Sequence, residues 1–349
     1  MLKLRSSEAR RIARTGSLHD DLRVSGPFRI AFLGAGMVAE LHQRAIARID
    51  GAELVGVYEP LAELARTRAR DWGCRAYASE SELLADPEVD GVFVLTPFDT
   101  HERLATDALN AHKHVLVEKP VAGPAGIERL LSLAEGVGRL CLPGHNYAYQ
   151  PEFQQLRSLV RDGSLGEVRA AWVTYAIRHP EEIAARYAGV MEEVMVHHAY
   201  LALSLFGKPS HVVAGAPESR WHGLEQDDQA WMTWTYPHGL TAHLFASFAV
   251  DDETADPWTF VVKILGTRGG GTYSWRSVSY DRPLGTLSRA FPAYEDSYVH
   301  QDTAFIASAT GARDAVVSPL SDALVVADVL ALARESANAG ARAPVTRPR

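Results

Sequence analysis

Two patterns of apolar and polar positions divide the chain near residue 150. Before that point, short continuous apolar runs alternate with segments whose apolar residues recur at helical spacing. Continuous apolar strands are typical of a parallel sheet covered on both faces. The predicted strands are 28–33, 53–58, 74–77, 91–95, 114–117 and 140–143, and the predicted helices are 37–49, 60–71, 79–84, 100–111 and 124–137. Residues 27–148 are therefore expected to form a Rossmann-type α/β domain with a doubly wound parallel sheet.

From residue 151 onward the strands alternate apolar and polar positions, as in 230–236, which the turn 237–239 follows. Alternating strands separated by turns, without helices between them, favour antiparallel pairing. The predicted strands are 166–178, 211–216, 228–236, 240–250, 258–266 and 271–275, and the predicted helices are 152–162, 190–206, 301–310 and 321–338. Segment 281–298 contains Pro283, Gly285 and Pro292 and is predicted to be a loop. Residues 149–349 are expected to form an α/β domain with an open, mostly antiparallel sheet.

Composition and charge argue against nucleic-acid-binding, membrane-spanning and disulfide-rich proteins. The 349 residues carry a formal net charge of −8, and the pI is about 6.0, which disfavours nucleic acid and anionic membrane as partners. No apolar run of about 18 residues occurs, so no transmembrane helix is expected. The two cysteines, Cys74 and Cys141, predict neither a disulfide framework nor a cysteine metal site, and we expect a cytoplasmic location.

The first 26 residues form a polar extension that is rich in Arg, Ser and Ala near its start. This segment lacks the apolar stretch of about 7–15 residues that a secretory signal requires. We expect a partly helical extension packed on a neighbouring surface. A transit peptide is the alternative.

The turn Gly34-Ala35-Gly36-Met37-Val38-Ala39 links the first predicted strand to the first predicted helix. In such a turn the first glycine permits the bend, the second lets backbone approach a pyrophosphate, and the small last residue lets helix and strand pack closely. The helix N-terminus adds free N–H groups and a positive dipole end. Glu59 ends the next strand, where a ribose hydroxyl needs an acceptor. Together these features predict a dinucleotide site; an ordinary tight turn is the alternative.

Several polar residues stand at the carboxyl ends of the predicted parallel strands, where dinucleotide sites form. They are Glu59, Thr96-Pro97, Glu118-Lys119-Pro120 and His145. Because lysine is almost never fully buried without a partner, Lys119 beside Pro120 is a candidate site residue. An ordinary solvated loop lysine is the alternative.

These motifs resemble those of the glucose–fructose oxidoreductase / inositol dehydrogenase (Gfo/Idh/MocA) family. The resemblance rests on the glycine turn, on Thr96-Pro97 with His101 four residues on, on Glu118-Lys119-Pro120 and on the turn His145-Asn146-Tyr147. It covers residues 28 to about 337. It implies NAD(P)-dependent oxidation or reduction of a sugar, cyclitol or related hydroxy compound by a dinucleotide domain and a second domain with an open antiparallel sheet. It also implies a dimer or tetramer formed through those sheets.

The resemblance implies a second catalytic element, an Asp-x-x-x-His pair on a helix of the second domain. Glu193 takes the aspartate position and His197 takes the histidine position. Because residues four apart share one face of a helix, both side chains are expected to point the same way. Glutamate is a departure from the family pattern, and Tyr200 stands where many members have an acid. His198 is interpreted as structural, and a surface helix with a charged pair is the alternative.

The predicted catalytic residues are Lys119, His197 and Glu193. His197 is the chosen general acid/base, Lys119 lowers the pKa of the hydroxyl or relays its proton, and these two roles are exchangeable. Glu193 orients the pair or tunes its charge. The predicted cofactor-binding residues are Gly34, Ala35, Gly36, Met37, Val38, Glu59, Thr96, Pro97, His101, Glu118 and Lys119, and the predicted substrate-binding residues are Lys119, His145, Tyr147, Glu193 and His197.

Cofactor preference, metal content and assembly can also be anticipated. The charge of Glu59 would repel a 2′-phosphate, and no arginine follows it immediately, so NAD is expected to be preferred over NADP. The 14 histidines show no metal-ligand spacing, and no metal is expected. Large aromatic residues such as Trp231 and Trp234 are costly to leave in water, so we expect a homodimer or homotetramer joined through the second sheet.

Two other functions are compatible with the same residues. In one, NAD stays bound and is recycled, while a transient keto group permits elimination or glycoside cleavage; such an enzyme shows no net cofactor reduction. In the other, the chain is a non-catalytic dinucleotide-sensing regulator. A sensor needs neither Lys119 nor His197, so the presence of both argues against it. The sequence does not identify the substrate.

Overall fold

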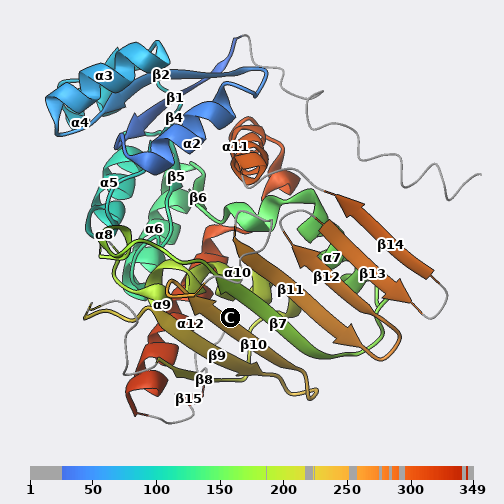
Figure 1. Ribbon diagram of the computed structural model, residues 1–349. Coiled ribbons are helices and arrows are strands. Elements are labelled where there is room, and N and C mark those ends of the chain that lie inside the picture. Colours follow the sequence, from blue (N-terminus) through green and yellow to red (C-terminus); the bar gives the residue numbers. More distant parts are fainter. Residues whose placement is uncertain are drawn as a thin grey trace, which may run out of the picture.

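The computed structural model of the chain describes residues 26–185, 187–216, 223, 225–250, 258–274, 277–282, 285–290, 295–339 and 343–344. The predicted polar extension lies, except for Gly26, outside these described residues. Two β-sheets with packed helices make up the described part, and they lie beside each other (Figure 1).

The first sheet has six parallel strands in the order β3-β2-β1-β4-β5-β6. Its strands are β1 (Phe28–Leu33), β2 (Ala52–Tyr58), β3 (Arg75–Ala76), β4 (Gly91–Val94), β5 (His114–Val117) and β6 (Cys141–Pro143). The connecting helices are α2 (Met37–Ile46), α3 (Ala62–Trp72), α4 (Glu80–Ala85), α5 (Phe98–Asn110) and α6 (Pro124–Val137). The predicted doubly wound sheet is confirmed. Its strand order reverses between β1 and β4, and ligands bind beyond the carboxyl ends of strands at such a point.

The second sheet has nine strands in the order β14-β13-β12-β11-β7-β10-β9-β8-β15. Its strands are β7 (Val168–Ala176), β8 (His211–Gly215), β9 (Gln229–Thr235), β10 (Thr241–Ser247), β11 (Thr259–Gly266), β12 (Gly270–Ser274), β13 (Ser277–Arg282), β14 (Gly285–Ala290) and β15 (Ala343–Pro344). The remaining helices are η2 (Asn146–Tyr149), α7 (Pro151–Arg161), α8 (Glu181–Ala184), α9 (Val190–Glu193), α10 (Met195–Phe206), α11 (Glu295–Ala309), η3 (Arg313–Ala315) and α12 (Leu320–Ala339). Among these strands only β7 and β10 pair in parallel, which confirms the mostly antiparallel prediction.

The predicted loop at 281–298 is wrong. β13 and β14 form an antiparallel pair in which Arg282 stands opposite Gly285, and α11 begins at Glu295. Gly285, which was expected in a loop, is the first residue of β14, whereas Pro283 and Pro292 lie outside the described residues.

Helices from the end of the chain pack against the first sheet. Arg44 of α2 forms an ion pair with Glu295 of α11 at 3.1 Å. The ring of Phe305, also on α11, packs edge-on against Phe93 of β4 at 5.1 Å between centroids. Leu320 at the start of α12 is buried in the same apolar cluster as residues of α6. α12 also packs on β8 of the second sheet, and α11 packs on η2, so these two helices link the first sheet to the rest of the described chain (Figure 1).

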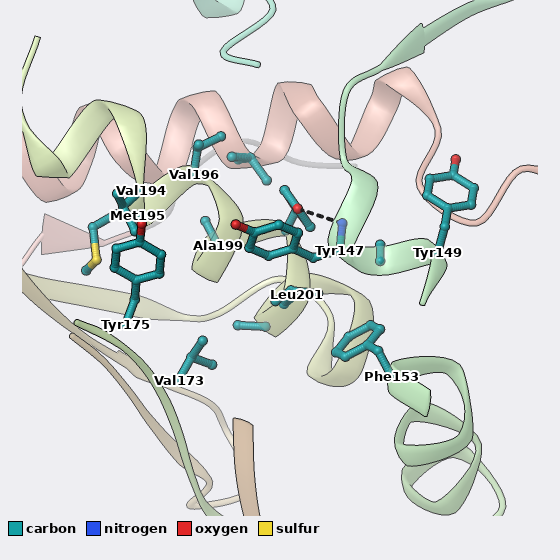
Figure 2. Close-up of a cluster of buried hydrophobic side chains, with 14 of the residues drawn as sticks. Tyr147, Tyr149, Phe153, Val173, Tyr175, Val194, Met195, Val196, Ala199 and Leu201 are labelled. Atoms are coloured by element: carbon teal, nitrogen blue, oxygen red, sulfur yellow. Dashed lines mark hydrogen bonds between the residues drawn. The ribbon is translucent and has the colours of Figure 1, made fainter. Parts of the chain in front are cut away.

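Helix α10 lies in the interior between the second sheet, η2 and α12. Its sequence is apolar on nearly every side, and a helix of that kind is expected to be buried all round. Figure 2 shows Tyr147 of η2 close to Ala199 of α10, with Val173 of β7 on the sheet side. Two polar residues of α10, His197 and His198, are consequently buried as well.

Candidate active site

The glycine turn provides an open helix N-terminus. Gly34 has a φ of 101°, and a Cβ there would lie 2.4 Å from the carbonyl oxygen of Leu95. Only glycine fits this position. Gly36 is the N-cap of α2, and a Cβ there would meet nothing within 4 Å. Among the described residues, no atom therefore crowds the backbone at the N-terminus of α2 beside Gly36, and the first N–H groups of a helix are the ones that bind anions.

The carboxylate of Glu59 is fixed beside this turn. Its Oε2 accepts a hydrogen bond from the Ala35 amide at 3.2 Å, and its Oε1 accepts one from the Leu61 amide at 3.3 Å. Three large apolar side chains at the same edge of the sheet are unusually exposed: Met37 by 69%, Leu61 by 67% and Phe98 by 51%. Exposed apolar side chains around polar groups are typical of a ligand-binding surface.

His101 joins two of the predicted strand-end motifs. Its Nδ1 lies 2.8 Å from the Pro120 carbonyl oxygen, its Nε2 lies 2.7 Å from the Thr96 carbonyl oxygen, and the residue is only 2% exposed. The structure thus brings Thr96-Pro97 and Lys119-Pro120 together. Both ring nitrogens of His101 contact protein carbonyls, so this side chain acts by holding the two motifs together.

Glu118 is held by a buried histidine that the sequence analysis missed. Oε2 of Glu118 accepts from the Lys119 amide at 2.9 Å, and Oε1 lies 3.5 Å from Nε2 of His42. The other ring nitrogen of His42 lies 2.9 Å from both carboxylate oxygens of Asp302 on α11. Burial alone lowers the pKa of His42, but Asp302 and Glu118 raise it to about 9. Burial alone raises the pKa of Glu118, whereas His42 and the charge of Lys119 lower it overall.

The ammonium of Lys119 contacts Glu193. Nζ donates to Oε2 of Glu193 at 3.1 Å and to the backbone oxygen of Glu193 at 3.3 Å. The side chains of Lys119 and Glu193 are 18% and 20% exposed. The structure therefore brings together these two residues, one after β5 and the other at the end of α9.

A single helix over 190–206 was predicted, and this prediction is wrong. The helix is interrupted at Val194, and the amide of His197 donates to the Val194 carbonyl at 2.9 Å. In a regular α-helix that amide would donate to Glu193. The interruption leaves the Glu193 carbonyl available to Lys119, and it places Glu193 and His197 on different helices.

The start of α9 is fixed by Asp227 and Arg334, which sequence reasoning also missed. The Met191 amide donates to Oδ2 of Asp227 at 2.8 Å, and Oδ1 pairs with Arg334 at 2.9 Å. Arg334 also pairs with Glu192. Gly189, with a φ of 129°, has no room for a Cβ because Asp227 Oδ1 would lie 2.7 Å from it. These contacts hold the short helix that carries Glu193.

His197 is 7% exposed and lies in a group of aromatic rings. Its Nδ1 is 2.8 Å from the hydroxyl of Tyr200, and its ring stacks on Tyr147 with centroids 4.2 Å apart and planes 14° from parallel. Burial lowers the pKa of His197 well below its ordinary value, and the charge of Lys119 lowers it further. The imidazole is therefore neutral at neutral pH.

His145 and Tyr147 are more deeply buried than His197. His145 is 1% exposed, its Nδ1 lies 2.7 Å from the Ser318 hydroxyl, and its ring stacks on Tyr200 at 4.1 Å. Burial lowers the pKa of His145 to about 3. Tyr147 is 3% exposed. Direct substrate contacts by these two residues stay predictions.

A cavity of about 830 Å³ lies at the amino ends of β1 and β5, lined by Arg29, Lys113 and His114 among others, and it contains none of the predicted site residues. Within the described residues, no group of three His, Cys, Asp or Glu side chains is placed to hold a metal ion. No described helix has the length and apolar character to cross a membrane.

The fold and the strand-end site define a dinucleotide-binding oxidoreductase class. Residues 28–145 match the family sequence model described as "Oxidoreductase family, NAD-binding Rossmann fold", and residues 153–271 match the "GFO/IDH/MocA C-terminal domain". The chain belongs to the Gfo/Idh/MocA family. The resemblance inferred from the motifs is confirmed.

Known proteins agree with this placement. The chain is 32% identical to 4-carboxy-2-hydroxymuconate-6-semialdehyde dehydrogenase of Sphingobium sp. over 51% of its own length, and 28% identical to inositol 2-dehydrogenase of Rhizobium meliloti over 54%. Each match covers 58% of the relative's length. The solved structure of levoglucosan dehydrogenase with NADH and levoglucosan aligns over 92% of this chain and 100% of that chain, with a TM-score of 0.82 and 17% identity. That structural likeness establishes the fold.

Proposed function

We propose that the protein is an NAD-dependent oxidoreductase that interconverts a hydroxyl and a keto carbon of a sugar, cyclitol or related polyhydroxylated compound. The observation that carries this proposal is the Lys119–Glu193 pair beside the neutral His197, at the carboxyl edge of an NAD-binding fold. Two relatives support the substrate class, because their names denote action on inositol and levoglucosan. We further propose that 27–148 binds the cofactor, that 149–349 binds the substrate, and that the protein is cytoplasmic.

The described residues fit a dinucleotide. The open N-terminus of α2 would hold the pyrophosphate, Glu59 would accept ribose hydroxyls, and the exposed Met37, Leu61 and Phe98 would contact the apolar faces of the cofactor. Bound NAD would supply the hydride acceptor or donor. The carboxylate of Glu59 supports NAD over NADP, since a 2′-phosphate would be repelled. Titration with both cofactors tests this preference, and equal or tighter NADP binding would reject it.

The residues of this chain must hold the reacting carbon and move one proton. A substrate oxygen between Lys119 and His197 would exchange its proton with one of these groups, and the neighbouring N–H groups would stabilise negative charge on that oxygen. Glu193 would fix the Lys119 ammonium through the two contacts described above.

Substitution of the two groups tests the function. Lys119→Ala and His197→Ala should each leave NAD affinity nearly unchanged, and each should lower kcat about 10²–10⁴-fold, because proton transfer by a positioned side chain is worth that much. The double variant should lose less than the product of the single losses, since both groups act on one proton. Steady-state kinetics with polyols and cofactor titration are the measurements. Wild-type kcat in both single variants would contradict the proposal, and turnover without net NADH formation would favour a cofactor-recycling enzyme.

We also propose a homo-oligomer joined through the outer face of the second sheet. On this face Trp172, Trp231 and Leu265 are exposed by 36%, 43% and 41%, and Trp172 stacks on His243. Trp234 points the other way and is fully buried, so only part of the predicted aromatic set supports the interface. Light scattering should give a multiple of 38.1 kDa, and a monomer at micromolar concentration would reject the assembly.

A further inference from the structure

The hydroxyl oxygen of Tyr200 has a fixed acceptor role. The backbone amide of Tyr147 donates to it at 3.2 Å (dashed line in Figure 2). This amide lies in the first turn of η2, where backbone N–H groups have no carbonyl partner within the helix. A backbone amide can only donate, so the oxygen of Tyr200 must accept in this contact.

The same oxygen lies 2.8 Å from Nδ1 of His197, and one hydrogen must lie between these two atoms. A phenolic hydroxyl combines one O–H donor with an acceptor position. With the Tyr147 amide donating to this oxygen, the geometry favours the arrangement in which the O–H of Tyr200 donates to Nδ1. Nδ1 is then the acceptor, and a neutral imidazole in this arrangement carries its hydrogen on Nε2.

The surroundings keep this arrangement in place. The ring of Tyr147 stacks on His197, and the ring of His145 stacks on Tyr200 with planes 18° apart. The ionisable groups that act on His197 are Lys119 after β5, His198 on α10 itself and His145 before η2, and each disfavours an imidazolium. The nearby carboxylate of Glu193 is paired with Lys119.

We propose that Tyr200 is a positioning residue that holds His197 in its Nε2–H form, so that His197 is a fixed hydrogen-bond donor and Lys119 is the proton carrier. In the oxidation direction, the Lys119 ammonium first releases a proton to solvent, and the substrate O–H bond then breaks as an N–H bond forms on the resulting neutral amine. His197 keeps its own hydrogen throughout and stabilises the negative charge that develops on the substrate oxygen. This assignment rests on the proposed function and decides between the two roles left open there.

The tautomer can be observed without any turnover. In protein labelled with ¹⁵N-histidine, the His197 resonances are identified by their loss in His197→Gln. We expect a protonated Nε2 and an unprotonated Nδ1 at neutral pH. In Tyr200→Phe these resonances should shift toward a mixture of tautomers, whereas Tyr149→Phe, a buried tyrosine of the same η2 turn, should leave them unchanged. A protonated Nδ1 in the wild-type protein would overturn the proposal.

Kinetics give a second, independent test. Glutamine places an amide N–H near the position of imidazole Nε2 but cannot carry a proton between states. His197→Gln should stay within about tenfold of wild-type kcat and keep its pH profile, whereas His197→Ala should lose about 10²–10³-fold, the typical loss for one such donor. A glutamine variant as slow as the alanine variant would overturn the proposal. If no polyol is oxidised by the wild-type protein, the proposed function fails, while the labelled histidine still reports whether Tyr200 sets the tautomer.

Discussion

His42 and His197 are both buried, and one contacts Glu118 while the other lies within the electrostatic influence of Lys119, yet they have different charge states. Carboxylates of Asp302 and Glu118 flank His42, and they outweigh burial and raise its pKa to about 9. His197 faces the hydroxyl of Tyr200, and burial and the charge of Lys119 lower its pKa well below the ordinary value.

Burial alone therefore does not decide the charge of a histidine; the charge of the groups on its two nitrogens does. His42, cationic at neutral pH, joins α2, α11 and the Glu118 turn and holds two carboxylates there. The neutral His197 lies where proton transfer is proposed. The molecule thus keeps one buried imidazole charged and, in the arrangement proposed above, uses another as a neutral donor.

The largest effect on stability is expected from removing Asp302, the buried partner of His42. Asp302→Ala leaves a buried cation with one fewer partner and should lower the free energy of unfolding by about 3–5 kcal/mol. The matched control is Glu295→Ala, which removes the exposed pair with Arg44 between the same two helices and should cost at most about 1 kcal/mol. Urea unfolding measures both. Equal losses in the two variants would show that the buried His42–Asp302 contact stabilises the fold no more than the exposed Arg44–Glu295 pair.

A smaller effect is expected in the pH dependence of stability. The pKa of His42 is about 9 in the folded protein and about 6.5 when unfolded, so its contribution is complete below pH 6.5 and is lost as pH rises through 9. The unfolding free energy of the wild-type protein should therefore fall between pH 7 and about 10 more steeply than that of His42→Gln. Since lysines and tyrosines titrate in both proteins, the difference between the two curves is the measurement. Parallel curves would mean that His42 is not protonated in the folded protein at neutral pH.

The sequence predicted much of this molecule because its signals are local. The strand, the glycine turn and the acid at Glu59 follow one another within about 30 residues, as a dinucleotide motif requires. Apolar continuity predicted the parallel sheet, and alternation predicted the antiparallel sheet. The choice of Lys119, Glu193 and His197 as catalytic residues used the family resemblance, and the structure brings Lys119 and Glu193 into contact.

The features that sequence reasoning missed depend on residues far apart in the chain. His42 and Asp302 are 260 positions apart, and a histidine on the inner face of an amphipathic helix gives no sign of its partners. The interruption at Val194 was also missed, because spacing of four residues predicts a continuous helix. The Glu193 carbonyl accepts from Lys119, and the Asp227–Arg334 pair fixes the start of α9; both contacts come from residues far from Val194 in the chain.

The smallest effect is expected on the His197 side, from Glu193→Gln. The Lys119–Glu193 ion pair is about one-fifth exposed, and its backbone contact at 3.3 Å survives the substitution, so kcat should fall only about two- to fivefold. Removing a negative charge makes a neighbouring ammonium release its proton at lower pH. If Lys119 is the proton carrier, the rise of kcat with pH in the oxidation direction should therefore move to lower pH. Glu192→Gln is the matched control, because Glu192 lies on the same turn but pairs with Arg334, and its profile should coincide with that of the wild type. A profile that moves in the control but not in Glu193→Gln would show that another charge governs the reaction, and the contrast between the two histidines would then have to be explained without Lys119.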